Sequence, residues 1–187
     1  MGIMEYVYIL GSYRSLVQGT RPRVSLTPRG LPRYLALMPR IALLIAAAGS
    51  GTRAGGVVPK QYQPLHGVAI LRRSLNAFGH RADIVATQIV VGSGQEEMFR
   101  LAAAGLKLLP PVAGADTRSH SVFHGLQALS VQRPDFVLIH DAARPLVSRA
   151  LIDRVIAALE SGADAAIPLL PVADTLKTEA GGHWKTV

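Results

Sequence analysis

The 187-residue sequence contains no cysteine, and aromatic residues make up only 5% of it. The missing cysteine excludes disulfides, thiolate metal ligands and a cysteine nucleophile. The longest strongly apolar run, Ile41 to Ala48, is far shorter than the roughly 20 residues of a membrane-spanning helix. No aromatic residues are interleaved with the basic ones as a stacking platform for bases. We therefore expect a soluble, cytoplasmic protein with neither a membrane nor a nucleic acid as partner.

Acidic residues are also scarce, since 12 Asp and Glu against 20 Lys and Arg give a net charge of +8. Residues 1–40 hold six arginines and one glutamate, which accounts for +5 of that charge. The rest of the chain is nearly balanced. Its small excess of cations suits an anionic small molecule better than a long phosphate backbone.

Residues 1–37 are rich in Gly, Pro, Ser and Arg and lack apolar periodicity. Pro22, Pro28 and Pro32 break any helix in this stretch. We expect either a disordered leader or a spurious one, with translation starting at Met38 directly before the first clear strand. The folded domain is then expected to span residues 38–187.

From Arg40 onward, short apolar runs alternate with amphipathic stretches, which predicts a Rossmann-like α/β fold: a mostly parallel sheet with helices on both faces. Strands are expected at 41–46, 88–91, 107–112, 136–140 and 165–168, and helices at 71–78, 95–104, 119–129 and 148–160. Near Pro171 the chain becomes polar and irregular. It reaches Val187 without the closing helix expected of such a sheet, so the fold is expected to be incomplete at the C-terminus.

A loop of small residues, Ala46 to Arg53, directly follows the first expected strand. Its backbone N–H groups can face a ligand at the carboxyl edge of the sheet, and its small side chains let phosphates approach closely. Arg53 and Lys60 are two cations flanking this loop, as a triphosphate with a leaving pyrophosphate requires. A plain strand-to-helix turn with two solvated charges is the structural alternative.

Gly49, Gly51 and Ala54 also satisfy the loose dinucleotide fingerprint G-x-G-x-x-G/A. That fold needs an acidic residue about 20 positions later to hold a ribose, and the first acid after the loop is Asp83. A dinucleotide-dependent reductase therefore fits the sequence less well, and it is kept as the alternative from a different enzyme class.

Five motifs occur in one order: Ala-Ala-Gly-Ser-Gly-Thr-Arg (47–53), Pro-Lys-Gln-Tyr (59–62), Gly-Ala-Asp-Thr-Arg-Ser-His-Ser-Val (114–122), Asp-Ala-Ala-Arg-Pro (141–145) and Pro-Val-Ala-Asp-Thr-Leu-Lys (171–177). Together they closely resemble the 2-C-methyl-D-erythritol 4-phosphate cytidylyltransferase family of the non-mevalonate isoprenoid pathway. The resemblance runs from about Arg40 to Val187. It implies a nucleotidyltransferase-type fold, a homodimer, and transfer of CMP from CTP to the sugar-alcohol phosphate with release of pyrophosphate.

The resemblance also implies roles by position. Arg53 and Lys60 would be catalytic and stabilise the transition state. Asp141 would hold Mg²⁺ beside the triphosphate. The acceptor would meet Asp141, Arg144 and Thr175, the last from a neighbouring subunit's arm. The CTP-binding positions are Ala47, Ala48, Gly49, Ser50, Gly51, Thr52, Ala115, Asp116, Arg118, Ser121 and Ala142.

The sequence departs from the family pattern at two places. Ala115 stands where the family often has glycine, and the family continues beyond Val187 with further cations, a strand and a helix. A ribitol-5-phosphate cytidylyltransferase, which shares the CTP motifs, is therefore an alternative. Another alternative is an inactive nucleotide-binding fragment, for example of a bifunctional transferase/cyclase. His120 and His124 lie one helical turn apart, but without a third ligand in the pattern a zinc site is not expected.

Overall fold

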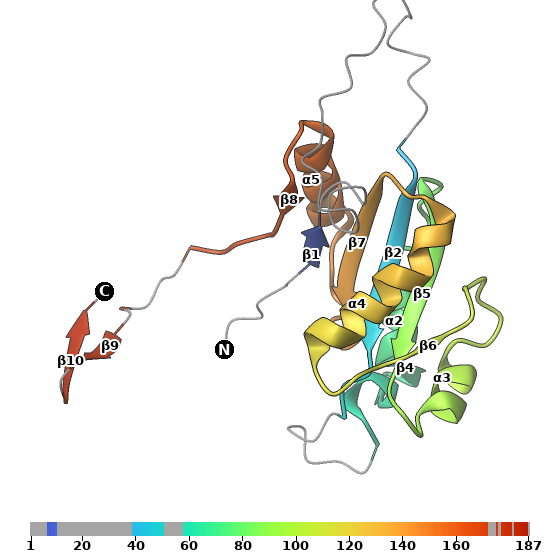
Figure 1. Ribbon diagram of the computed structural model, residues 1–187. Coiled ribbons are helices and arrows are strands. Elements are labelled where there is room, and N and C mark those ends of the chain that lie inside the picture. Colours follow the sequence, from blue (N-terminus) through green and yellow to red (C-terminus); the bar gives the residue numbers. More distant parts are fainter. Residues whose placement is uncertain are drawn as a thin grey trace, which may run out of the picture.

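A six-stranded sheet forms the centre of the computed structural model, which describes residues 7–10, 39–50, 58–171, 175, 177–180 and 182–186 (Figure 1). The strands lie in the order β6 (Val112–Ala113), β5 (Ile84–Val91), β2 (Ile41–Ala47), β7 (Phe136–Asp141), β1 (Val7–Leu10) and β8 (Ala165–Ala166). β2 is parallel to β5 and β7, and β5 is parallel to β6. The predicted, mostly parallel sheet is thereby confirmed.

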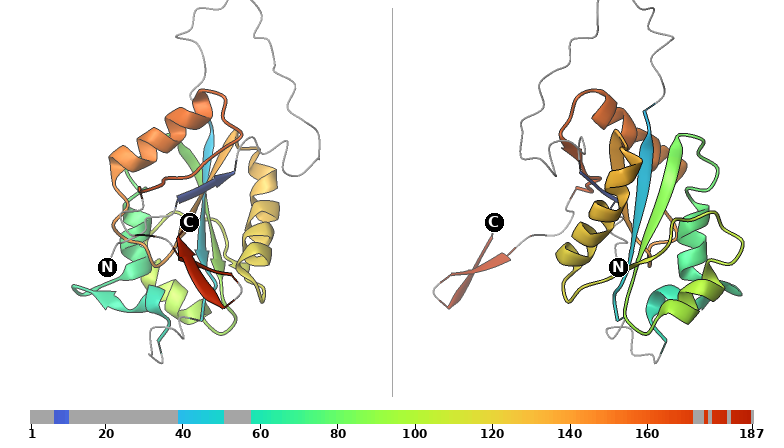
Figure 2. Two further views of the ribbon diagram at one scale, coloured as in Figure 1. Left: turned by 90° about the vertical axis from the view of Figure 1, so that its left-hand side faces the viewer. Right: turned by 45° about the vertical axis from the view of Figure 1, so that its right-hand side comes forward.

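Helices cover both faces of this sheet, as Figure 2 shows in its edge-on view. On one face lie α2 (Ile70–Asn76), α3 (Glu96–Ala102) and α5 (Arg149–Glu160), packed with Ile41, Leu43 and Ile45 of β2. On the other face lies α4 (Arg118–Leu129), packed with Ala42 and Leu44. Because β2 is buried on both sides, its sequence is continuously apolar rather than alternating.

Hydroxyl side chains start the two longest helices. Thr117 Oγ1 accepts a hydrogen bond from the His120 amide, and Ser148 Oγ accepts one from the Leu151 amide, both at 3.2 Å. Each bond satisfies one of the N–H groups that a helix leaves unpaired at its start. The predicted serine cap and the two predicted helices, 119–129 and 148–160, are confirmed to within a residue.

The third predicted strand is wrong over most of its length, because residues 107–111 form no ladder and β6 comprises only Val112–Ala113. Pro110 and Pro111 lack the N–H that a strand donates. The segment still runs beside β5 through isolated bonds. The Leu109 amide donates to the Thr87 carbonyl (2.9 Å), and Gln88 Nε2 donates to the Pro110 carbonyl (2.8 Å).

A small hairpin precedes α2 where the sequence pattern indicated no strands. It pairs β3 (Pro64–Leu65) with β4 (Val68–Ala69) and follows the 3-10 helix η3 (Lys60–Tyr62). His66 and Gly67 form its turn with φ values of 49° and 75°. Two consecutive positive φ values match the twist of a two-residue hairpin, and glycine adopts such a φ without strain. A second 3-10 helix, η4 (Ser130–Gln132), follows α4.

Strand β1 is a departure from the expectation that residues 1–37 contain no regular element. Val7–Leu10 pairs antiparallel with residues 137–140 of β7, and Ile9 and Leu10 also pair with β8. The segment Val-Tyr-Ile-Leu consists of residues favoured in strands. It covers an edge of β7 whose backbone groups would otherwise be unpaired. The domain boundary at residue 38 stays a prediction.

The last elements, β9 (Lys177–Ala180) and β10 (His183–Thr186), form an antiparallel hairpin. In Figure 1 and the right-hand view of Figure 2 this hairpin lies apart from the sheet. Trp184 is 70% exposed, and Leu169 and Leu170 before the hairpin are also exposed. We call residues 167–186 the arm.

Candidate active site

Three loops meet where parallel strands of the sheet end. They are residues 47–50 at the end of β2 and beyond it, residues 114–118 from β6 into the start of α4, and residues 141–144 at the end of β7 and beyond it. Direct bonds join two of them to neighbouring strands: the Ala142 amide donates to the Ala46 carbonyl of β2 (3.1 Å), and the Gly114 amide donates to the Val91 carbonyl of β5 (2.8 Å). This carboxyl edge is where open α/β sheets bind ligands.

Asp141 lies between two arginines at this edge. Arg118 donates to its Oδ1 from Nη2 (2.8 Å) and Nε (3.2 Å), and Arg144 Nε donates to its Oδ2 (2.8 Å). Burial of the carboxyl opposes ionisation, but the bonds from Arg144 and Arg118 outweigh it and lower the pKa of Asp141. The cluster of two guanidiniums and one carboxylate therefore carries a net positive charge, which suits a phosphate group.

Asp141 is the candidate donor for a divalent cation at this edge. In the part of the chain that the structure describes, no group of three or more His, Cys, Asp or Glu residues could hold a metal ion. A carboxylate offers about four acceptor sites, and three N–H contacts use three of those on Asp141. Mg²⁺ beside a nucleotide takes one or two carboxylates and fills its shell with phosphate and water oxygens. Asp141 fits that mode of binding, and an all-protein metal cage does not fit.

The loop after β2 packs closely against Gly92 and Gly114. A Cβ added to Gly114 would lie 2.3 Å from Ala48 Cβ, and one added to Gly92 would lie 2.9 Å from the Ala48 carbonyl oxygen. Both positions therefore require glycine for lack of space. Gln61 and Gln95 complete the support with buried side-chain amides, and Gln61 Nε2 donates to the Ala47 and Gly49 carbonyls at 2.8 Å each.

Of the two predicted catalytic cations, the structure describes Lys60 and not Arg53. Arg53 lies outside the described residues, together with Gly51 and Thr52 of the predicted CTP-binding loop. Lys60 is exposed and begins η3, directly before Gln61. Since Gln61 is bonded to the loop carbonyls, the backbone of Lys60 is tied to the same loop.

The other predicted CTP-binding and acceptor-binding positions divide into accessible and buried groups. Gly49, Ser50, Asp116, Arg118 and Thr175 are exposed. Ala47, Ser121 and Ala142 are buried, while Ala48, Ala115, Asp141 and Arg144 are partly buried.

Two of the buried positions, Ser121 and Ala142, make hydrogen bonds inside the protein. Ser121 Oγ accepts from the Ala115 amide (2.9 Å) and donates to the Ala115 carbonyl (3.2 Å). The Ala142 carbonyl accepts from the buried Ser74 hydroxyl (2.7 Å). These contacts shape the two loops from behind, which the motifs alone did not reveal.

His140, the residue before Asp141, is 1% exposed and supports the same loop. Its Nε2 lies 2.8 Å from the Arg144 carbonyl, and its ring meets Phe78 edge to face with centroids 5.1 Å apart. Burial lowers the pKa of His140. A neutral ring must donate its proton from Nε2 to that carbonyl, so Nδ1 is the unprotonated nitrogen. The sequence pattern gave no role to His140, Ser74, Gln61 or Gln95.

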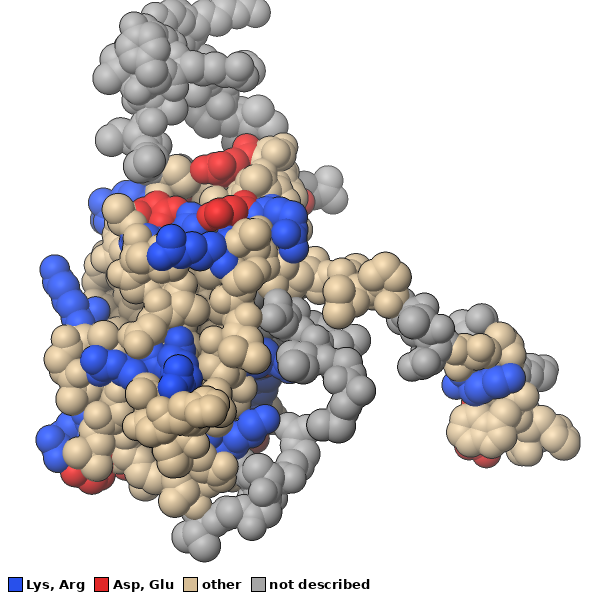
Figure 3. Space-filling view, turned by 180° about the vertical axis from the view of Figure 1, so that it is seen from behind, with Lys and Arg blue, Asp and Glu red and all other residues tan. Residues whose placement is uncertain are grey.

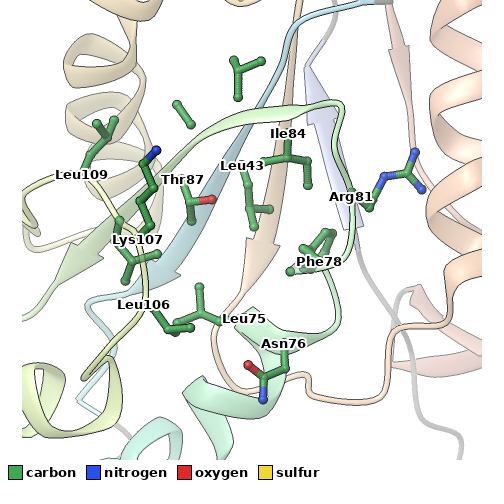
Figure 4. A pocket seen from close by; sticks show the side chains of 14 residues that line it. Leu43, Leu75, Asn76, Phe78, Arg81, Ile84, Thr87, Leu106, Lys107 and Leu109 are labelled. Carbon is green, nitrogen blue, oxygen red and sulfur yellow. The ribbon is translucent and has the colours of Figure 1, made fainter.

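A separate pocket of about 400 Å³ lies at the other end of β5 (Figure 4). Its walls come from the end of α2, the start of β5 and residues 106–109, with Leu43 and Phe78 among the apolar side chains. Arg81 at its edge is already bonded to Asp83 and Asp153. The loops at the carboxyl edge supply none of the lining residues, so this pocket is distinct from the candidate active site.

One face of the molecule shows how its basic side chains are distributed. On the face shown in Figure 3, basic side chains form separate groups with uncharged surface between them rather than one continuous stripe.

Among the described residues, every helix is too short or too polar to cross a membrane.

The sequence is similar to one protein family and to several curated proteins. The family model described as "2-C-methyl-D-erythritol 4-phosphate cytidylyltransferase" matches residues 41–185. The bifunctional enzyme IspD/IspF of Rhizorhabdus wittichii is 51% identical over 138 residues, which are 74% of this chain and 35% of that protein. The chain thus spans about a third of the length of the curated relatives it matches.

Two solved structures are similar in fold and sequence. A 4-diphosphocytidyl-2C-methyl-D-erythritol synthase superposes with a TM-score of 0.67 at 28% identity, covering 81% of this chain and 69% of that one. The bifunctional IspDF from Campylobacter jejuni superposes with a TM-score of 0.63 at 29% identity, covering 78% and 37%.

The layered, mostly parallel sheet places the chain in the class of α/β proteins with a nucleotidyltransferase-like fold. Within that class, the chain belongs to the 2-C-methyl-D-erythritol 4-phosphate cytidylyltransferase family.

Proposed function

We propose that this protein transfers CMP from CTP to 2-C-methyl-D-erythritol 4-phosphate, releasing pyrophosphate and forming the CDP-alcohol used in isoprenoid precursor synthesis. The observation that carries the proposal is the Arg118–Asp141–Arg144 cluster beside the supported loop Ala47–Ser50. Fixed positive charge and oriented backbone N–H groups converge there at one sheet edge. Family membership supports the choice of CTP and of this acceptor.

The reaction needs no covalent enzyme intermediate. A phosphate oxygen of the acceptor attacks the α-phosphorus of CTP in line, and the bond from that phosphorus to the β-phosphate oxygen breaks. The electron pair leaves with pyrophosphate. Because the acceptor phosphate is already ionised at neutral pH, a general base is dispensable, and catalysis rests on positioning and charge stabilisation.

In this proposal Lys60 and Arg53 neutralise charge on the transferring and departing phosphoryl groups. The loop from Ala47 to Thr52 wraps the triphosphate with backbone N–H groups. Residues of the turn into α4 and the loop after β7 would hold the cytidine: Ala115, Asp116, Arg118, Ser121 and Ala142. Arg144 is well placed for the acceptor phosphate, because its guanidinium is held at the sheet edge by Asp141.

We also propose Asp141 as the protein ligand of a magnesium ion that arrives with CTP. When bound, the ion would reduce the negative charge of the triphosphate oxygens. Asp141 suits this role because the neighbouring guanidiniums keep it ionised.

We further propose a cytoplasmic homodimer in which the arm of one subunit brings Thr175 to the acceptor site of the other. The domain would span residues 38–187. Thr175 and the exposed apolar side chains of the arm support this arrangement.

The direct test supplies the protein with CTP and Mg²⁺ and measures pyrophosphate release with either 2-C-methyl-D-erythritol 4-phosphate or ribitol 5-phosphate. We expect release with the first acceptor. Release with ribitol 5-phosphate alone would establish the alternative acceptor, whereas NADPH binding in place of CTP would contradict the nucleotidyltransferase proposal.

The role of Lys60 is tested in the same assay. Lys60→Ala should lower kcat by about a hundredfold or more while weakening CTP binding much less, because the charge is needed most in the transition state. Lys107→Ala, which removes an exposed lysine at the separate pocket, is the matched control and should behave as wild type. Equal losses of turnover and CTP affinity in Lys60→Ala would contradict the catalytic role.

A further inference from the structure

Two buried amide side chains lie beneath the loop after β2. Gln61 and Gln95 are only 4% and 8% exposed. Gln61 Nε2 donates to the Ala47 and Gly49 carbonyls, each at 2.8 Å, and lies 3.1 Å from Gln95 Oε1. Gln95 Nε2 lies 3.4 Å from the Gly49 carbonyl. Burial of an amide is costly unless it is hydrogen-bonded, and here the bonds converge on one loop.

These bonds fix the direction of the peptide groups in the loop. In a trans peptide the carbonyl and the following N–H point in opposite directions, and the described residues contain no cis peptide. Because Gln61 holds the Ala47 and Gly49 carbonyls inward, the N–H groups of Ala48 and Ser50 point away from Gln61. Gly49 and Ser50 are exposed, so the loop is accessible from solvent.

The Gln95 side chain also fills the space next to Gly92 beneath the loop. A Cβ added to Gly92 would lie 2.6 Å from Gln95 Nε2. The Gln95 amide therefore occupies a site shaped by the absence of a side chain at residue 92.

We propose that Gln61, supported by Gln95, is a positioning residue that aims the peptide N–H groups of the loop at the triphosphate of CTP. The inference rests on the function proposed above and adds to it. Gln61 also follows Lys60 in η3, so the same bonds set the distance between the loop and the backbone of the proposed catalytic lysine. Oriented N–H groups of this kind bind anions.

The test replaces Gln61 by methionine, which keeps the length of the side chain and removes its donors. Gln63→Met is the matched control, because Gln63 lies two residues away and its amide donates to the Val58 carbonyl rather than to the loop. For Gln61→Met we expect kcat/KM for CTP to fall about 10- to 100-fold, with the KM for the acceptor changed less than about twofold. Affinity for inorganic triphosphate, measured by calorimetry, should fall in parallel.

Other outcomes overturn the inference in distinguishable ways. If Gln61→Met matches Gln63→Met in an active protein, the positioning role fails and the proposed function stands. If the unmodified protein neither binds triphosphate nor releases pyrophosphate from CTP, both fail. Should Gln61→Met not fold by thermal unfolding, Gln95→Met tests the same bonds. It should show a smaller loss with the same selectivity for CTP, and an equal change in both KM values would overturn the inference.

Discussion

At the scale of single residues, the site depends on charges and carbonyls held by partners that are distant in sequence. Arg118 lies 23 residues before Asp141, and Ser74 lies 68 residues before the Ala142 carbonyl that it holds. His140 contributes differently, because it must be neutral to sit at 1% exposure beneath the loop after β7. A charged imidazole there would lose its hydration and face the Arg144 guanidinium.

This burial predicts that the protein loses stability in mild acid. The pKa of His140 is lower in the folded state than its ordinary value of 6.5. The unfolded chain therefore binds a proton first as the pH falls below about 6.5, and the free energy of unfolding decreases toward the folded pKa. The slope should reach about 1.4 kcal/mol per pH unit from this residue.

Chemical denaturation between pH 8 and pH 5 measures the effect. His140→Gln, which cannot titrate, should show a weaker dependence on pH, while His80→Gln, at an exposed position, should follow the wild type. A wild-type curve that is flat over this range would show that His140 is not buried in neutral form.

At the scale of elements, β7 links the sheet to the site. Val137 and Leu138 are fully buried, and the strand ends at Asp141. β2 pairs with one edge of β7 and β1 with the other, so β1 completes the hydrogen bonding of the strand that leads into the loop at Asp141.

Deleting residues 1–37 should therefore destabilise the protein by about 2–4 kcal/mol, because several ladder bonds at roughly 1 kcal/mol each are lost. Thermal or denaturant unfolding of a chain beginning at Met38 provides the measurement. Deleting residues 1–5 alone keeps β1 and is the control. Equal stability of all three chains would instead support a leader that is dispensable for folding.

At the scale of the whole molecule, the arm leaves large apolar side chains in solvent. Trp184 is 70% exposed, Leu169 74% and Leu170 68%. Large apolar side chains exposed in this way are typical of a protein–protein contact, in which an aromatic residue often carries much of the affinity. The proposed occupant is a second copy of this chain.

Sedimentation velocity over a range of concentrations tests this association. We expect a dimer whose dissociation constant rises about tenfold or more in Trp184→Gln. Val131→Gln alters a similarly exposed apolar residue in η4 and should leave the association unchanged. A wild-type protein that stays monomeric at every concentration would contradict the proposed dimer.

The sequence by itself determined the layers of the fold and the residues that meet at the sheet edge. Continuous apolar runs such as Ile41–Ala47 require burial on both faces, and helical spacing with a Ser148 cap defines α5. The motifs also identified the loops after β2 and β7, since both directly follow buried strands. These features are local, so they are readable from neighbouring residues.

Only the tertiary structure decided how those loops are held. The bonds from Gln61 and Gln95 to the loop after β2, and from Ser74 and His140 to the loop after β7, join distant segments. Tertiary pairing also placed β1 beside β7, although the composition of residues 1–37 predicted no element there. The physical reason is the same in each case: a buried polar group or a strand edge must find a partner, and chain packing rather than sequence proximity selects it.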